Sequence, residues 1–173
     1  MNKKVFQLIV DNTSGVLSRI SGLFSRRGYN IESITAGVTM DPKFTRITIV
    51  TSGDDDILEQ IEKQVAKLID VRSIVELTPE NSVYRELLMV KVKADATQRV
   101  EISTVVDIFR ANIIDVAVDS LIIELIGNQP KIDAFLSMLE GYEIFETART
   151  GIAGLSRGTE NISYKENKVD KQL

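Results

Sequence analysis

The feature that most constrains this fold is an order of predicted elements, strand–helix–strand–strand–helix–strand, that occurs twice along the chain. In the first half, alternating or β-branched runs predict strands, which lie at residues 4–10, 29–40, 44–51 and about 71–77. The first helix has a complete set of signals, with Ser14 as its predicted N-cap and Gly28 as its stop. A second helix is predicted to open at Asp54-Asp55-Asp56, where capping explains the carboxylates better than a metal does.

The same order appears again after a polar, proline-containing linker at residues 78–82. The elements predicted here are strands at 86–94, 113–118, 121–126 and from about 143, and helices at 101–110 and from Pro130 to the stop at Gly141. We therefore predict an α+β protein of two ferredoxin-like βαββαβ domains, residues 1–78 and 83–158. Residues 159–173 are polar and charged and are predicted to form a disordered tail.

Composition excludes several kinds of chemistry. The chain contains neither histidine nor cysteine, so it has no Ser-His-Asp or Cys-His nucleophile, no disulfide and no ordinary zinc site. A net charge of −4 argues against broad nucleic-acid binding. No apolar run approaches the roughly 18 residues of a membrane helix, and we expect a cytoplasmic protein. A binding module is favoured over an enzyme, with no catalytic or metal-binding residue assigned.

The loop that precedes the first helix is the strongest candidate for a binding site. Residues 12–15, Asn-Thr-Ser-Gly, lead onto a helix start, where unpaired N–H groups and the helix dipole favour an anion. The local pattern alone favours an ordinary strand–helix turn for this loop, and turn geometry as the reason for Asn30. The second copy of this loop, residues 95–98, has no counterpart of Gly15, and we expect it not to bind the same ligand.

The strands predict a further surface for association. Apolar residues such as Val5, Ile47, Ile49 and Ile74 are too many to lie beneath two helices, and a sheet apolar on both faces needs a partner. We therefore expect a homodimer. Residues 154–158 fit either a partner-binding segment or a loop at the end of the second domain.

Five segments give the chain a specific resemblance to a known family. These are NTSGVLSRISGLFSRRGYNIESI at residues 12–34, LEQIEKQVAKLIDV at 58–71, VYREL at 83–87, IFRANIIDV at 108–116 and ARTGIAGLSRG at 148–158. Together they closely resemble the small, regulatory subunit of acetolactate (acetohydroxyacid) synthase, which begins with an ACT domain, an amino-acid-sensing βαββαβ module. The resemblance covers nearly the whole chain up to Gly158.

The resemblance implies a regulatory subunit that is not an enzyme on its own. Such subunits bind and activate a catalytic large subunit, a thiamine-diphosphate-dependent transferase of branched-chain amino acid biosynthesis. They confer allosteric feedback inhibition by valine, and thiamine diphosphate, magnesium and FAD belong to the catalytic subunit. The alternatives are a free-standing amino-acid-binding ACT sensor without a catalytic partner, and an enzyme on the same scaffold.

The resemblance also implies a valine site between the ACT domains of a homodimer. Its positions carry over to Asn12 and Gly15 in the loop of one chain and Asn30 on the second strand of the other. Backbone N–H groups at Gly15, Val16 and Leu17 would take the carboxylate, and the Asn12 and Asn30 amides would accept from the ammonium. The effector-binding residues expected on this basis are Asn12, Gly15, Val16, Leu17, Asn30 and Ile31, the three apolar side chains forming the wall for the isopropyl group.

Overall fold

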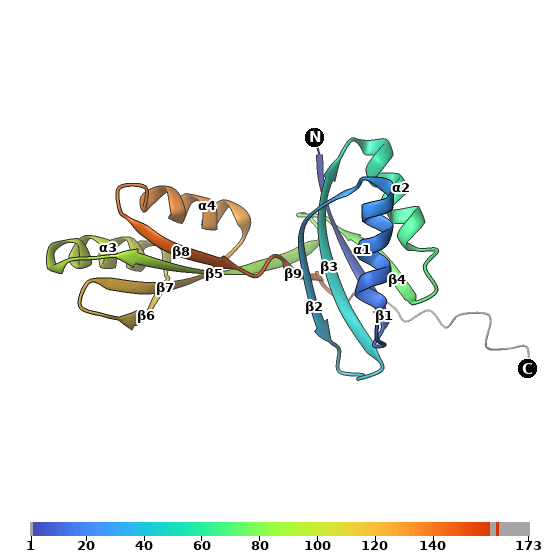
Figure 1. Ribbon diagram of the computed structural model, residues 1–173, viewed down its shortest axis with the longest axis horizontal. Coiled ribbons are helices and arrows are strands. Elements are labelled where there is room, and N and C mark those ends of the chain that lie inside the picture. The colour runs from blue at the N-terminus through green and yellow to red at the C-terminus, as the bar shows by residue number, and fades with distance from the viewer. Residues whose placement is uncertain (1, 160–161, 163–173) are drawn as a thin grey trace, which may run out of the picture. The chain divides into compact units, whose positions relative to one another are not determined.

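The computed structural model describes residues 2–159 and residue 162. In chain order the elements are β1 (Asn2–Asp11), α1 (Val16–Arg27), β2 (Asn30–Val38), β3 (Phe44–Gly53), α2 (Asp55–Val65), β4 (Val71–Leu77), β5 (Ser82–Lys93), α3 (Ala96–Phe109), β6 (Asn112–Val116), β7 (Ser120–Gly127), α4 (Gln129–Met138), β8 (Ile144–Arg149) and β9 (Ala153–Ser156) (Figure 1). The contacts divide them into two compact units, each with its own sheet and its own core. The predicted class, α+β with two βαββαβ units, is confirmed.

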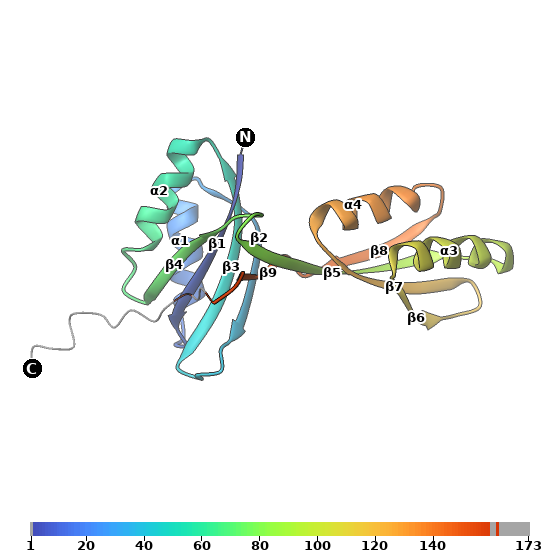
Figure 2. The same cartoon turned by 180° about the vertical axis from the view of Figure 1, so that it is seen from behind.

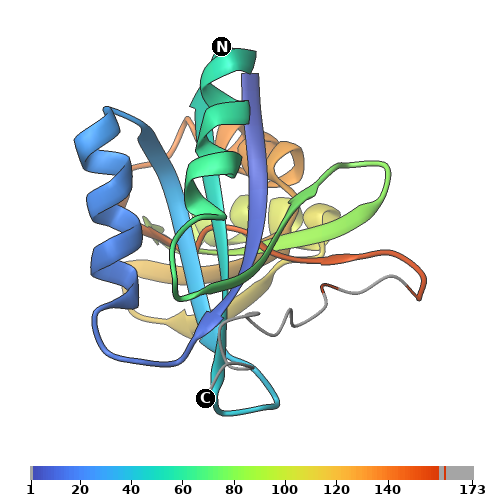
Figure 3. The ribbon, with the colours of Figure 1, turned by 90° about the vertical axis from the view of Figure 1, so that its right-hand side faces the viewer.

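The first unit is a four-stranded antiparallel sheet, in the order β2-β3-β1-β4, covered on one face by α1 and α2 (Figure 3). Alternation along β1 separates the two faces. Phe6, Leu8 and Val10 lie in the core beneath the helices, whereas Gln7 and Ile9 lie on the opposite face. Each helix packs one apolar face into this core. The helical spacing of these apolar residues is the pattern that predicts both helices.

The two helix starts of this unit differ. Asp54 is the N-cap of α2, as predicted, and its side chain accepts from the backbone N–H of Ile57 at 2.9 Å. The predicted Ser14 cap of α1 is wrong, because Gly15 occupies the N-cap position in the left-handed region, with φ +82°. A turn that needs positive φ at this point places glycine at the cap and moves serine one residue outside it.

The last strand of the chain covers part of the face opposite the helices. β9 lies on this side of the first unit (Figure 2), and Gln7 Nε2 donates to the carbonyl oxygen of Gly154 at 2.5 Å. The sequence predicts that a second chain covers this sheet face. In the structure, β9 of the same chain covers part of it. Residues 154–158, for which two interpretations stood open, supply most of β9 and a backbone hydrogen bond from Arg157 N to Asn81 O.

The second unit repeats the plan with the sheet order β6-β7-β5-β8 and with α3 and α4 packed in its core. α3 begins at Ala96, five residues before the predicted start, because Asp95 and Gln98 form a capping box. Asn128 caps α4, with Pro130 in its first turn as predicted. The unit found by contacts is Tyr84–Gly151. β9 falls within the predicted range 83–158 and pairs with β5, but its contacts group it with the first unit.

The predicted disordered tail, residues 159–173, lies outside the described residues except for Thr159 and Ile162. Among the described helices, none combines the length and the apolar character that crossing a membrane requires.

Replacing Gln7 by alanine tests how β9 is held. Gln7 is 1% exposed, and its amide both donates to Gly154 and accepts from Arg46. Gln7→Ala leaves the part-buried carbonyl oxygen of Gly154 and the Arg46 guanidinium without their partner, so we expect a loss of about 1–3 kcal/mol in the free energy of unfolding. Urea titration measures this loss, and faster amide exchange at residues 153–156 locates it. Gln60→Ala, at an exposed position of α2, should change stability by less than about 0.5 kcal/mol. Equal losses in both variants would contradict the proposed role of Gln7.

Candidate functional site

The loop between β1 and α1 is anchored to the turn between β2 and β3. Asn12 Nδ2 donates to the carbonyl oxygen of Pro42 at 2.8 Å, and Asn12 Oδ1 accepts from Thr45 Oγ1 at 3.1 Å. The backbone N–H of Asn12 donates to the carbonyl oxygen of Lys43 at 2.7 Å. A neutral amide can make four hydrogen bonds, so one N–H and one lone pair of Asn12 remain beyond these contacts. Asn12 therefore positions the loop and keeps some capacity for a ligand.

α1 starts without a side-chain cap, whereas α2, α3 and α4 are each capped by an aspartate or asparagine. The first α-helical bond at this end runs from Arg19 N to Gly15 O at 2.9 Å. The N–H groups of Val16 and Leu17 lie in the turn that no helix satisfies internally. These free N–H groups and the positive end of the helix dipole together favour binding of a carboxylate.

Two arginine–aspartate pairs brace the elements around this helix start. Arg19 contacts Asp70 with two hydrogen bonds, Nε to Oδ2 at 2.5 Å and Nη2 to Oδ1 at 2.8 Å. Arg72 contacts Asp11 in the same forked way, at 2.6 and 2.7 Å. The hydrogen bond with Asp70 raises the pKa of the Arg19 guanidinium. Sequence reasoning missed both pairs, since their partners lie 51 and 61 residues apart and no local pattern marks them.

Asn30 lies at the opposite end of the first unit. It begins β2 and pairs with Ser52, whereas Asp11, next to Asn12, pairs with Phe44 at the other end of β3. Eight residues of extended strand separate Phe44 from Ser52, about 26 Å. Asn30 instead lines a pocket of ≈ 570 Å³ with residues that include Gly28 and Asp55. Within one chain, the structure does not bring Asn30 to the Asn12–Gly15 loop.

The three apolar residues expected near the ligand differ in how far their side chains are exposed to solvent. Val16 is 4% exposed and belongs to the core, and Ile31 is partly buried against the same core. Leu17 is 49% exposed on the first turn of α1. Leu17 is thus the one of the three whose side chain is open to a ligand or a partner.

β2 is an edge strand of the first unit's sheet. Ile34 and Val38 are 40% and 61% exposed, and their partners in β3, Ile49 and Thr45, place them on the helix-covered face. α1 and β2 run in opposite directions, so Val38 and Leu17 lie at the same end of the unit. An open helix start therefore lies beside an exposed strand edge with apolar side chains, a surface suited to association with another strand.

Within the described residues, no group of three or more carboxylate side chains is placed to hold a metal ion. The two helix starts where carboxylates gather, Asp54 and Asp95, use them to cap α2 and α3. The arrangement at the β1–α1 loop is suited to holding an anionic or zwitterionic small molecule.

Comparison with known proteins places the chain among small subunits of one synthase. A family model described as "AHAS small subunit-like ACT domain" matches residues 6–73, and one described as "Small subunit of acetolactate synthase" matches residues 85–158. The acetolactate synthase small subunit of Mycolicibacterium smegmatis is 48% identical over 155 residues, covering 90% of this chain and 91% of the relative. The isozyme 3 small subunit of Escherichia coli K12 is 46% identical, covering 90% and 96%.

A solved structure agrees with these sequence relatives. The crystal structure of the acetolactate synthase small subunit from Thermotoga maritima matches with a TM-score of 0.84 and 40% sequence identity. The match covers 92% of this chain and all of that one.

Replacing Gly15 by alanine tests the geometry of the helix start. An added Cβ would lie 2.9 Å from Arg19 Nη1, on a backbone that already disfavours any side chain, with φ +82°. Gly28→Ala is the matched control, because φ is +67° there and a Cβ meets nothing within 4 Å. We expect Gly28→Ala to cost about 1 kcal/mol in the free energy of unfolding. Gly15→Ala should cost more, because the Arg19 guanidinium that would have to move aside is held by two hydrogen bonds to Asp70.

The extra cost at Gly15 should disappear in an Arg19→Ala background, where the obstructing group is absent. Urea unfolding of the single and double variants measures this coupling. Equal costs for Gly15→Ala with and without Arg19 would contradict the contact.

Proposed function

Because the chain belongs to the family of acetolactate synthase small subunits, we propose that it binds and activates the catalytic large subunit of that enzyme and makes it sensitive to valine. In this proposal the chain has no catalytic residue and no cofactor of its own. Thiamine diphosphate, magnesium and FAD would be held by the large subunit. The lack of histidine and cysteine supports this division, since the usual nucleophile–base pairs need one or the other.

We further propose that valine binds where the open start of α1 meets β2 of a second copy. The carboxylate would accept from N–H groups of the first turn of α1, beyond Gly15. The remaining lone pair of Asn12 and the amide oxygen of the partner's Asn30 would accept from the ammonium. The exposed Leu17 would contact the isopropyl group.

The observation that carries this proposal is the separation of Asn30 from the loop within one chain. If two copies pair their β2 edges antiparallel about a two-fold axis, the start of one β2 lies opposite the end of the other. The end of β2 is next to the β2–β3 turn, to which Asn12 is bonded. This pairing therefore brings Asn30 from the partner to the loop, which no single chain can do.

A site built from two chains also accounts for regulation. A ligand that contacts both protomers stabilises the dimer arrangement that it fits, and the shift is set by its differential affinity for the two arrangements. Inhibition would follow if the valine-bound arrangement of the small subunits holds the large subunit in a less active form.

Reconstitution tests the division of labour between the subunits. We expect no acetolactate from this chain alone, more from the large subunit with the chain than without it, and less again when valine is added. A colorimetric acetolactate assay measures all four conditions. Product from the isolated chain, or a mixture no faster than the large subunit alone, would overturn the proposal.

Asn30→Ala tests the strand half of the valine site. Losing an oxygen that accepts from a charged ammonium should raise the valine concentration for half-inhibition by about tenfold or more, with activation of the large subunit kept. Asn112→Ala is the matched control, since Asn112 begins β6 as Asn30 begins β2. Valine sensitivity that is equal in the two variants would argue against this site.

A further inference from the structure

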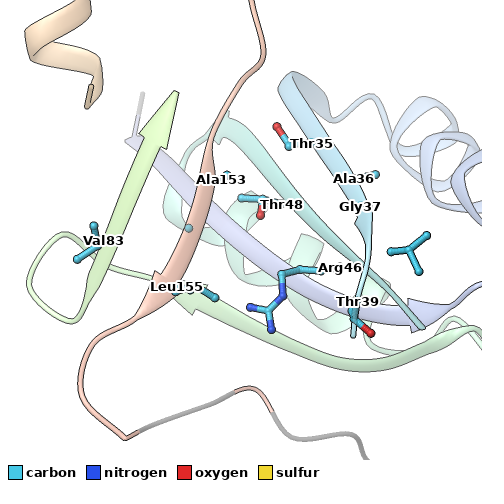
Figure 4. Close-up of a pocket in the computed structure, with 11 residues that line it drawn as sticks. Thr35, Ala36, Gly37, Thr39, Arg46, Thr48, Val83, Ala153 and Leu155 are labelled. Atoms are coloured by element: carbon cyan, nitrogen blue, oxygen red, sulfur yellow. The ribbon is translucent and has the colours of Figure 1, made fainter. Parts of the chain in front are cut away.

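The face of the first unit opposite α1 and α2 contains a second hollow. It has a volume of ≈ 460 Å³, within the range of about 300–1,000 Å³ typical of small-molecule sites. All of its lining residues belong to the first unit: Thr35, Ala36, Gly37, Val38, Thr39, Arg46, Thr48, Val83, Ala153, Gly154 and Leu155. Figure 4 shows the segment Ala153–Leu155 passing across the sheet beside Thr48 and Arg46. We refer to this hollow as the β9 pocket.

Arg46 supplies the only charge among the lining residues of the β9 pocket. Its side chain is half-buried, and Nη1 donates to Gln7 Oε1, a neutral acceptor, at 2.9 Å. Arg19, Arg72 and Arg149 each contact a carboxylate, whereas no ion pair is found for Arg46 in the part of the chain that the structure describes. A guanidinium presents five N–H donors, so most of its donor capacity is available to an anion.

Gln7 fixes this guanidinium in place. Its Nε2 must face the carbonyl oxygen of Gly154, so its Oε1 must face Arg46. The Gln7 side chain is buried and makes both bonds at once, which holds Arg46 at the edge of the pocket before any ligand arrives. A preorganised cation beside apolar walls favours an anion that also carries an apolar group.

The other lining residues specify the rest of the ligand. Val83, Ala153 and Leu155 are apolar, and the hydroxyl of Thr48 offers a neutral hydrogen bond. No aspartate or glutamate lines the pocket, so an ammonium group would find no opposite charge there. We propose that the β9 pocket binds a short aliphatic monocarboxylate without an amino group, such as a branched 2-oxo or 2-hydroxy acid. This site lies on the opposite face of the sheet from the apolar side chains that flank the valine site proposed above.

Gly37 allows the pocket to be filled without disturbing the fold. It pairs with Arg46, so a side chain there would point to the same face of the sheet. An added Cβ meets no atom within 4 Å, and the backbone does not have positive φ. Gly37→Val should therefore occupy the hollow with a side chain suited to a strand.

The test adds 3-methyl-2-oxobutanoate, isovalerate or valine to the full chain. Calorimetry measures the affinity of each compound, and changes in amide chemical shifts show which residues it contacts. We expect both acids to bind and to shift residues 35–39 and 153–155. Arg46→Gln should weaken that binding about tenfold or more, and Gly37→Val should abolish it. Arg26→Gln, an exposed arginine at the end of α1, should leave it unchanged. Valine should not shift residues 153–155.

Each other outcome overturns the β9 pocket as an acid site. These outcomes are no binding of either acid at 10-fold the concentration used for valine, equal binding in Arg46→Gln and Arg26→Gln, and valine shifting the same residues as the oxo acid. Neither pocket variant alters Asn12, Gly15 or Asn30. Arg46 lies on β3, away from the β2 edge proposed to pair with a second copy, so valine inhibition of the enzyme reconstituted with Arg46→Gln reports separately on the proposed function.

Discussion

The proposed two-chain site depends on the register of the antiparallel ladder formed by β1, β3 and β2. Asp11 pairs with Phe44 and Asn30 with Ser52, which places the β1–α1 loop and the start of β2 at opposite ends of one sheet. The rigid strand β3 keeps these two ends about 26 Å apart, so they cannot approach each other within one chain. A ligand that needs both segments must therefore take them from two chains. The unpaired edge of β2 provides the means, since antiparallel pairing about a two-fold axis reverses the second strand and exchanges its ends.

The two units share one plan, but their first helices start differently. α3 is closed by the Asp95–Gln98 capping box, so its first-turn donors are already used, whereas α1 begins at a glycine that has no side chain to offer. In the first unit, both faces of the sheet pack against other segments of the chain. The helices cover one face, and β9 crosses the other, where Gln7 connects it to Arg46. Because β9 follows directly on the second unit's last strand, whatever alters the β9 pocket acts on a segment covalently joined to that unit.

Local patterns predicted much of this architecture, and the exceptions have physical reasons. The stop at Gly28, the Asp54 cap and Pro130 in the first turn of α4 all act within one helical turn, so the sequence shows them directly. Apolar spacing alone predicts a later start for α3 than the structure has, and the capping signal of Asp95 and Gln98 marks the true start. The bond between Gln7 and Gly154 spans 147 residues, so no local pattern predicts it. Of the expected site residues, local reasoning located the start of α1 but assigned it a Ser14 cap that it lacks. It also could not show that Val16 is core or that Asn12 is bonded to Pro42.

Mixing two defective chains tests most directly whether one valine site needs two protomers. Gly15→Asp places a carboxylate in the loop where valine's own should bind, and Asn30→Ala removes the strand contact, so dimers of either variant alone should bind valine poorly. A mixed dimer has one site with both defects and one intact site, formed by the loop of the Asn30→Ala chain and the strand of the Gly15→Asp chain. After subunit exchange at equal amounts, calorimetry should recover high-affinity valine binding at about a quarter of the sites. No recovery, despite mixed dimers detected by mass spectrometry, would mean that each chain binds valine with its own residues.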